Sequence, residues 1–195
     1  MTLALFDFDG TITNKDSMID FIKFSRDQKQ VILGVIILFP IIALFYMKLL
    51  PDFVAKKYVL KYFFGGKKYA DLENLANRYS DQRIDQIIRP KAAEKIDFYL
   101  KNGDKVAIVS ASVELWVAPW AKKRGLDLIA TKAEVIDGFF TGNLASLNCK
   151  GAEKARRIKE RYDLADFAEI HAYGDTPSDR EMFKIAAYSE YKPFQ

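Results

Sequence analysis

Short apolar runs alternate with amphipathic segments over the second half of the chain, and this pattern predicts an α/β fold. Apolar, β-rich runs occupy 3–8, 105–109, 126–130 and 169–173, and helical patterns occupy 114–124, 150–162 and 179–187. Strands that alternate with helices pair in parallel, so we predict a doubly wound, Rossmann-like parallel sheet. Residues 133–141, with Asp137-Gly138 at their centre, have the pattern of a small β-hairpin.

Between the first two predicted strands the pattern is helical only. Amphipathic or apolar helical segments follow one another at 14–27, 31–50, 53–64 and 69–79, and a helix at 90–101 leads into the second strand. We therefore predict an α/β core of residues 1–13 and 91–195, interrupted by an all-helical cap of residues 14–90.

Seventeen residues of this cap, 31–47, carry no charge. A membrane-spanning helix needs about 20 apolar residues, and Pro40 is expected to divide the run into two halves, each too short to cross a bilayer. The lysines Lys56, Lys57 and Lys61 follow among aromatic residues, and the cap has 13 Lys and Arg against 8 Asp and Glu. This pattern is typical of peripheral membrane contact, here through residues 31–64. The alternatives are a helix buried at the centre of the cap and a helix half buried in a homodimer.

Composition and charge narrow the class of protein. The 195 residues are enough for one core domain with a small inserted module. A net charge of +4, mixed in sign along the chain, does not indicate nucleic acid binding. The single cysteine, Cys149, excludes an internal disulfide and fits a reducing compartment. No signal-peptide pattern precedes the first strand, so we expect a cytoplasmic protein, peripheral on the inner face of the membrane if the apolar segment meets lipid.

Polar side chains of complementary chemistry stand where predicted strands end or the next helices begin. They are Asp7, Asp9, Ser110, Lys150, Asp175 and Asp179. In a doubly wound fold such positions converge on one edge of the sheet. Carboxylates without a neighbouring His or Cys suit a hard cation such as Mg²⁺. A serine hydroxyl at a helix start suits a phosphate oxygen, and a lysine supplies the charge that phosphoryl transfer needs.

The pair Asp7 and Asp9 is the centre of this prediction. Residues i and i+2 of a strand point to the same side, so both carboxylates are expected to leave the strand end together. Two adjacent carboxylates repel each other and need a cation or a shared proton. The alternative is an ordinary Asp-x-Asp surface turn after a strand.

Four short segments, in order, resemble the signature motifs of haloacid dehalogenase-like phosphatases. They are DFDGT at 7–11, VSAS at 109–112, NCKGAEK at 148–154 and GDTPSD at 174–179. The helical insert between the first two is similar to the cap of the phosphoserine-phosphatase-like subclass. The resemblance covers nearly the whole chain.

The resemblance implies a mechanism with an aspartyl-phosphate intermediate. By analogy Asp7 is the nucleophile, and Asp9 is the acid that protonates the leaving group and the base that activates water. Lys150 is the expected partner of Asp7 and of the phosphate, because it follows the polar Asn148-Cys149 pair. Lys154 is the competing lysine.

The resemblance also implies the phosphate-binding and metal-binding residues. Ser110, with Ala111 beside it, would bind the phosphoryl group, and Thr11 would brace the loop. Mg²⁺ would be held by Asp7, by the backbone carbonyl of Asp9 and by Asp175. Asp179 would hold the water shell of the metal or contact Lys150.

The substrate is the least determined part of the prediction. Phosphoserine phosphatases usually have Ser where this chain has Gly10, and a cap Glu that reads the substrate amine, for which Asp16 is the nearest match. We predict a phosphomonoester hydrolase whose substrate is a phosphorylated small molecule or a lipid headgroup. Phosphatidylglycerophosphate is one lipid candidate, because some relatives with similar caps act on it. The alternative is a soluble small-metabolite phosphatase, and a more remote one is a phosphate-binding module without catalysis.

Overall fold

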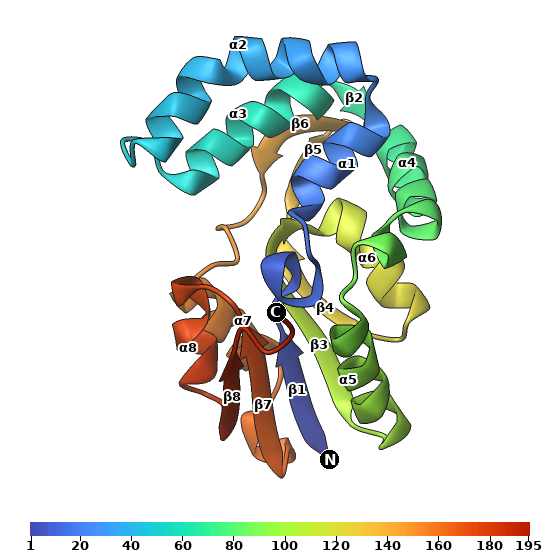
Figure 1. Cartoon of the computed structure of the whole chain (residues 1–195), viewed down its shortest axis with the longest axis vertical. Coiled ribbons are helices and arrows are strands. Elements are labelled where there is room, and N and C mark those ends of the chain that lie inside the picture. Colours follow the sequence, from blue (N-terminus) through green and yellow to red (C-terminus); the bar gives the residue numbers. More distant parts are fainter.

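The computed structural model describes all 195 residues and has a five-stranded parallel sheet at its centre (Figure 1). The strand order is β4-β3-β1-β7-β8, and every neighbouring pair is parallel. The strands are β1 (Thr2–Phe6), β3 (Lys105–Val113), β4 (Asp127–Thr131), β7 (Glu169–Gly174) and β8 (Tyr188–Tyr191). The predicted doubly wound α/β fold is therefore confirmed. Strand β8 was not predicted, since its sequence YSEY has no apolar run.

The alternation of β1 separates two hydrophobic clusters, one on each face of the sheet. Ala4 and Phe6 belong to the cluster that includes residues of α5 (Pro90–Lys101) and α6 (Glu114–Lys123). Leu3 and Leu5 belong to the cluster that includes residues of α7 (Ala152–Arg161) and α8 (Arg180–Phe183). All four side chains are fully buried, which explains why the strand has no polar face. Helix α8 has only four residues, so the helix predicted at 179–187 is shorter than expected.

Four helices between β1 and β3 lie beyond the carboxyl ends of the strands (Figure 1). They are α1 (Ser17–Ser25), α2 (Gln28–Tyr46), α3 (Asp52–Phe64) and α4 (Tyr69–Gln82). Helices α2 and α3 pack side by side at the end of the molecule farthest from the N-terminus. Gly34 permits this contact, because a Cβ atom at residue 34 would lie 2.3 Å from the Phe63 ring.

Pro40 does not divide the apolar segment, and the expectation of two short halves is wrong. Helix α2 runs continuously from Gln28 to Tyr46. A proline inside a helix removes one hydrogen bond, but packing on both sides of it can compensate for that loss. Here Leu38 before the proline is buried, and Ile42 after it packs against the same hydrophobic cluster.

The segment predicted as all-helical also contributes one short strand. Lys67–Lys68 form β2, which pairs antiparallel with β6 (Phe139–Leu144), and β6 pairs with β5 (Ala133–Ile136). Strands β5 and β6 form the predicted hairpin, with positive φ angles of 51° at Asp137 and 80° at Gly138. The hairpin projects away from the parallel sheet towards α3 (Figure 1). A Cβ atom at Gly142 would lie 2.4 Å from the Cα atom of Lys61, so the glycine permits close contact between β6 and α3.

Candidate active site

The chain turns sharply after β1, and this turn places the two predicted catalytic carboxylates. The Asp7 backbone N–H donates to the carbonyl of Tyr173 (2.9 Å), which ties the strand end to β7. Residues Phe8–Ile12 then form one wide turn, closed by the Thr13 N–H bond to the Phe8 carbonyl (3.0 Å), in which Asp9 and Gly10 have non-helical backbone angles and Gly10 has a φ of 84°. A Cβ atom at residue 10 would lie 2.5 Å from the Asp175 carboxylate, so only glycine allows this close approach. Strand β1 ends at Phe6, and Asp7 and Asp9 therefore leave the sheet within the turn.

Lys154, and not Lys150, is the lysine at the strand end. Its Nζ atom donates to Asp7 Oδ1 (2.5 Å) and to Asp179 Oδ1 (2.7 Å), and its side chain is only 1% exposed. Lys150 is 48% exposed and pairs with Asp52 of α3. The physical reason is the start of α7 at Ala152: Lys154 lies in its first turn and points back to the sheet edge, whereas Lys150 precedes the helix. The expectation that Lys150 contacts Asp7 is corrected accordingly.

Three carboxylates converge beside this lysine. Oxygens of Asp7, Asp175 and Asp179 lie within 4.8 Å of one another. The Thr11 hydroxyl lies 3.2 Å from Asp7 Oδ2 and 3.0 Å from Asp175 Oδ1, and its single hydrogen can serve one of them at a time. Thr11 therefore lies between the turn after β1 and the turn after β7, and its role as a brace of this loop stays a prediction.

The electrostatics of this cluster favour a bound cation. Burial raises the pKa of Asp7 to about 7, although Lys154 acts in the opposite direction. Asp179 uses one oxygen for Lys154 and the other for the backbone N–H groups of Asp175 and Thr176 (3.1 and 2.9 Å). Asp7 and Asp175 therefore have more free lone pairs than Asp179. An all-oxygen donor set of this kind fits Mg²⁺.

Ser110 lies in the carboxyl-terminal half of β3, three residues before its end, and is buried at the same edge of the sheet. Its Oγ atom accepts the Ser112 backbone N–H (3.0 Å), which leaves its hydroxyl hydrogen for an acceptor such as a phosphate oxygen. The Ala111 carbonyl points to other partners, the Thr131 hydroxyl (2.8 Å) and the Lys56 ammonium (2.8 Å).

Asp9 is held apart from Asp7 by separate hydrogen bonds. Its Oδ1 accepts the Ser17 backbone N–H (2.6 Å), and its Oδ2 accepts the Ser112 hydroxyl (2.5 Å). Burial raises the pKa of Asp9, and the charge of nearby Asp16 acts in the same direction. Asp16 is exposed and caps α1 by accepting the Ile19 backbone N–H (2.9 Å).

Lys56 is a functional candidate that sequence reasoning assigned to the wrong surface. The sequence pattern predicts that Lys56 faces a membrane with Lys57 and Lys61, but its Nζ atom donates to Ala111 O (2.8 Å) and Asn148 Oδ1 (3.1 Å) of the core. Burial lowers its pKa, while the charges of Asp9 and other carboxylates oppose this effect. The sequence signal for this position is helical spacing: Lys56 lies four residues before Leu60, which is buried, so the two side chains are on the same side of α3.

The chain is similar to several known proteins. The model of a family described as haloacid dehalogenase-like hydrolase matches residues 4–184. The chain is 34% identical to Protein CicA of Caulobacter vibrioides over 195 residues, which cover 99% of this chain and 86% of that protein.

Two solved structures have the same fold. A Bordetella pertussis Tohama I protein of unknown function superposes with a TM-score of 0.84 at 24% identity, over 96% of this chain and 88% of that one. A phosphoserine phosphatase with a phospho-aspartyl intermediate analogue gives a TM-score of 0.65 at 21% identity, over 96% and 84%.

Proposed function

The chain belongs to the haloacid dehalogenase-like hydrolase family and is a phosphatase of that family, and on this premise we propose that it hydrolyses phosphomonoesters through an aspartyl-phosphate on Asp7. The resemblance seen in the four sequence motifs is thereby confirmed. The observation that carries the proposal is the buried contact between Asp7 and Lys154 beside Asp175, with Asp9 held separately two residues later.

The proposed reaction has two steps. A carboxylate oxygen of Asp7 attacks phosphorus, the bond from phosphorus to the substrate oxygen breaks, and Asp9 gives its proton to that oxygen. Water then attacks the same phosphorus, Asp9 takes a proton from it, and the bond from phosphorus to Asp7 breaks to release phosphate. Lys154 lowers the repulsion between Asp7 and the anionic substrate, and the Ser110 hydroxyl binds a phosphoryl oxygen.

The carboxylates Asp7 and Asp175 and the carbonyl of Asp9 are proposed to hold Mg²⁺, with Asp179 supporting the Asp175 loop. The ion would supply positive charge next to the transferring phosphoryl group.

The test of the nucleophile is Asp7→Asn. This variant is expected to lose Mg²⁺-dependent hydrolysis of p-nitrophenyl phosphate while its far-UV circular dichroism is unchanged. Asp9→Asn is expected to slow release of the intermediate, so that acid quenching traps phosphate bound to the protein. Asp81→Asn, at an exposed position paired with Lys123, is the matched control. Turnover by Asp7→Asn comparable to the control would exclude Asp7 as the nucleophile.

A second candidate, a phosphatase of lipid phosphates, is favoured by the outer surface of α2. This helix is long and apolar enough to cross a membrane, with a mean hydropathy of 2.2, and only 11% of its most apolar 18 residues are buried. Ile36 and Phe39 are each 64% exposed, and the helix lies flat on α3. We propose that α2 lies along a lipid surface with its apolar side in the interfacial region, and that the enzyme acts at the cytoplasmic face of the membrane.

Vesicle flotation tests this second candidate. Vesicles rich in phosphatidylglycerol are expected to carry the protein upward at low salt, and Ile36→Ser with Phe39→Ser is expected to leave it at the bottom. Lys57→Glu with Lys61→Glu should weaken flotation, because both lysines lie on α3, which packs against α2, and the substitutions replace positive charges that attract anionic lipids. Lys61 is exposed. Wild-type protein that stays at the bottom as a dimer would favour the soluble-metabolite alternative, with a second copy covering α2. Parallel assays on soluble phosphate esters and on lipid phosphates in detergent would then separate the substrates.

A further inference from the structure

A line of buried hydrogen bonds connects Asp9 to the first helix of the cap. The Ser112 hydroxyl donates to Asp9 Oδ2 (2.5 Å), and its Oγ atom lies 3.0 Å from Ser17 Oγ. The Trp116 indole N–H donates to Ser17 Oγ (3.0 Å). Ser17 and Trp116 are fully buried, and Ser112 is nearly so. None of these three residues has a role in the chemistry described above.

When Asp9 is ionised, chemistry determines the direction of every bond in this line. An indole N–H can only donate, so Ser17 Oγ accepts from Trp116 and its own hydrogen is free for Ser112. An ionised carboxylate can only accept, so the Ser112 hydrogen goes to Asp9. The line therefore runs in one direction, from Trp116 through Ser17 and Ser112 to Asp9. The backbone N–H of Ser17 occupies the second oxygen of the same carboxylate.

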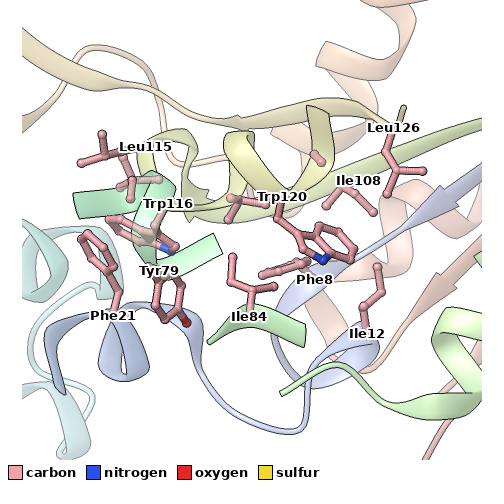
Figure 2. Packing of buried hydrophobic residues seen from close by; sticks show 14 of the residues in the cluster. Phe8, Ile12, Phe21, Tyr79, Ile84, Ile108, Leu115, Trp116, Trp120 and Leu126 are labelled. Carbon is pink, nitrogen blue, oxygen red and sulfur yellow. The ribbon is translucent and has the colours of Figure 1, made fainter. Parts of the chain in front are cut away.

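The line crosses from the core to the cap. Ser112 lies on β3 and Trp116 on α6, whereas Ser17 is the first residue of α1. The Trp116 ring stacks on Phe21 of α1, with ring centres 5.4 Å apart and planes at 22°. Phe21 in turn contacts Tyr79 of α4 with ring centres 5.2 Å apart, and Figure 2 shows the three rings together. A shift of α1 against α6 would therefore alter both the ring stacking and the bonds to Asp9.

We propose that Ser17 and Ser112 are positioning residues for Asp9, and that the line from Trp116 makes the placement of this carboxylate depend on how α1 is seated on the core. This proposal rests on the proposed function, in which Asp9 transfers a proton to the leaving group. A general acid acts only within hydrogen-bond reach of the atom it protonates, so a carboxylate free to rotate loses that contribution. Ser112 also donates its backbone N–H to Ser110, and it thereby links the proton donor to the phosphate-binding serine.

The test compares two substrates of similar size that differ in how much they need an acid. The value of kcat/KM reports the steps up to and including transfer of the phosphoryl group to Asp7. In these steps the leaving group of phenyl phosphate needs a proton far more than that of p-nitrophenyl phosphate does, because phenolate is the more basic of the two. Ser112→Ala is expected to lower kcat/KM for phenyl phosphate by about tenfold more than for p-nitrophenyl phosphate. Ser17→Ala is expected to show a smaller effect of the same kind, because its hydroxyl acts through Ser112. Ser112→Thr keeps a hydroxyl and is expected to restore the selectivity.

Two controls separate the outcomes. Ser80→Ala removes a buried hydroxyl that has no hydrogen-bond partner, so it is expected to leave the ratio of the two substrates unchanged. Asp9→Asn removes the acid itself and therefore gives the largest expected change in the ratio of kcat/KM for the two substrates. If Asp9→Asn changes the ratio but Ser112→Ala and Ser17→Ala lower both substrates equally, the positioning role is refuted. If Asp9→Asn itself leaves the ratio unchanged, the assignment of Asp9 as the acid fails and the proposal falls with it.

Discussion

Replacement of Lys154 by methionine removes the one cation that contacts both Asp7 and Asp179. Methionine has a similar length and no charge, so the two carboxylates would remain buried without their partner. The matched control is Lys150→Met, four residues earlier, which removes an exposed lysine paired with Asp52. The two variants delete the same chemical group from the same motif and differ only in what that group contacts.

The expected cost follows from burial and distance. Lys154 is 1% exposed and makes ion pairs of 2.5 and 2.7 Å with carboxylates that are themselves buried. Removal of one partner from a buried ion pair costs about 3–5 kcal/mol, whereas an exposed pair contributes about 1 kcal/mol or less. A domain of this size is stable by about 5–15 kcal/mol, so Lys154→Met is expected to fold with a much lower free energy of unfolding.

The assay is urea unfolding followed by tryptophan fluorescence, in EDTA, together with phosphatase activity in Mg²⁺. Lys154→Met is expected to lower kcat/KM about 10²–10³-fold, the usual loss when a charge-stabilising donor is removed, and Lys150→Met is expected to keep most of the activity. In an Asp7→Asn background the stability cost of Lys154→Met should be smaller by about 1 kcal/mol or more, because one of the two unpaired carboxylates is gone.

Equal effects of the two lysine variants on stability and activity would refute this reasoning. It would also be refuted if Lys154→Met cost the same in the Asp7→Asn background, since the cost would then not arise from the contact with Asp7.

Three further predictions follow from the site. EDTA should abolish hydrolysis and Mg²⁺ should restore it, and Asp175→Asn should raise the Mg²⁺ concentration needed for half-maximal activity; full activity in EDTA would contradict the carboxylate site. Gly10→Ala should lose activity, because its Cβ atom would lie 2.5 Å from the Asp175 carboxylate at a φ of 84°, and this is checked by assay beside a thermal melt. Burial lowers the pKa of Lys56 in the folded protein. At a pH between the folded and the unfolded pKa of this lysine, the unfolded chain binds more protons than the folded one, so the free energy of unfolding rises with pH. Urea unfolding between neutral pH and pH ~10 should therefore show a shallower rise with pH for Lys56→Met than for the wild type.

The strand ends were predictable from the sequence because each has its own local signal. Asp7 and Ser110 each follow an apolar run that is buried on both faces, and Asp175 follows β7, in which Ile170, Ala172 and Tyr173 are buried. Parallel pairing then brings these positions to one edge of the sheet without any knowledge of side-chain contacts. The cap gave weaker signals, since the continuity of α2 through Pro40 depends on packing of Leu38 and Ile42 against distant residues.

The choice between Lys150 and Lys154 shows where local patterns stop being sufficient. Both lysines lie in NCKGAEK, and the choice depends on the residue at which α7 begins. Gly151 has a φ of 59° and precedes the helix, so the helical repeat starts at Ala152 and places Lys154, together with the buried Ile158, on the inner side. The sequence contains the glycine, which is a common residue where the backbone needs a positive φ. The glycine alone does not select Lys154 over Lys150, because the choice also depends on the direction of α7 relative to β1.

Helix geometry also explains why the pattern of basic residues predicts the wrong surface for Lys56. Lys56 and Lys57 are adjacent, and the side chains of adjacent helical residues point about 100° apart. A count of basic residues groups the two lysines together, although the helix places them on different sides. Lys56 lies on the side of α3 that carries Leu60 and contacts the core next to Ser110. The positive charges of the cap are therefore separated: Lys61 is exposed on α3, whereas Lys56 contacts the core and its charge interacts with that of Asp9.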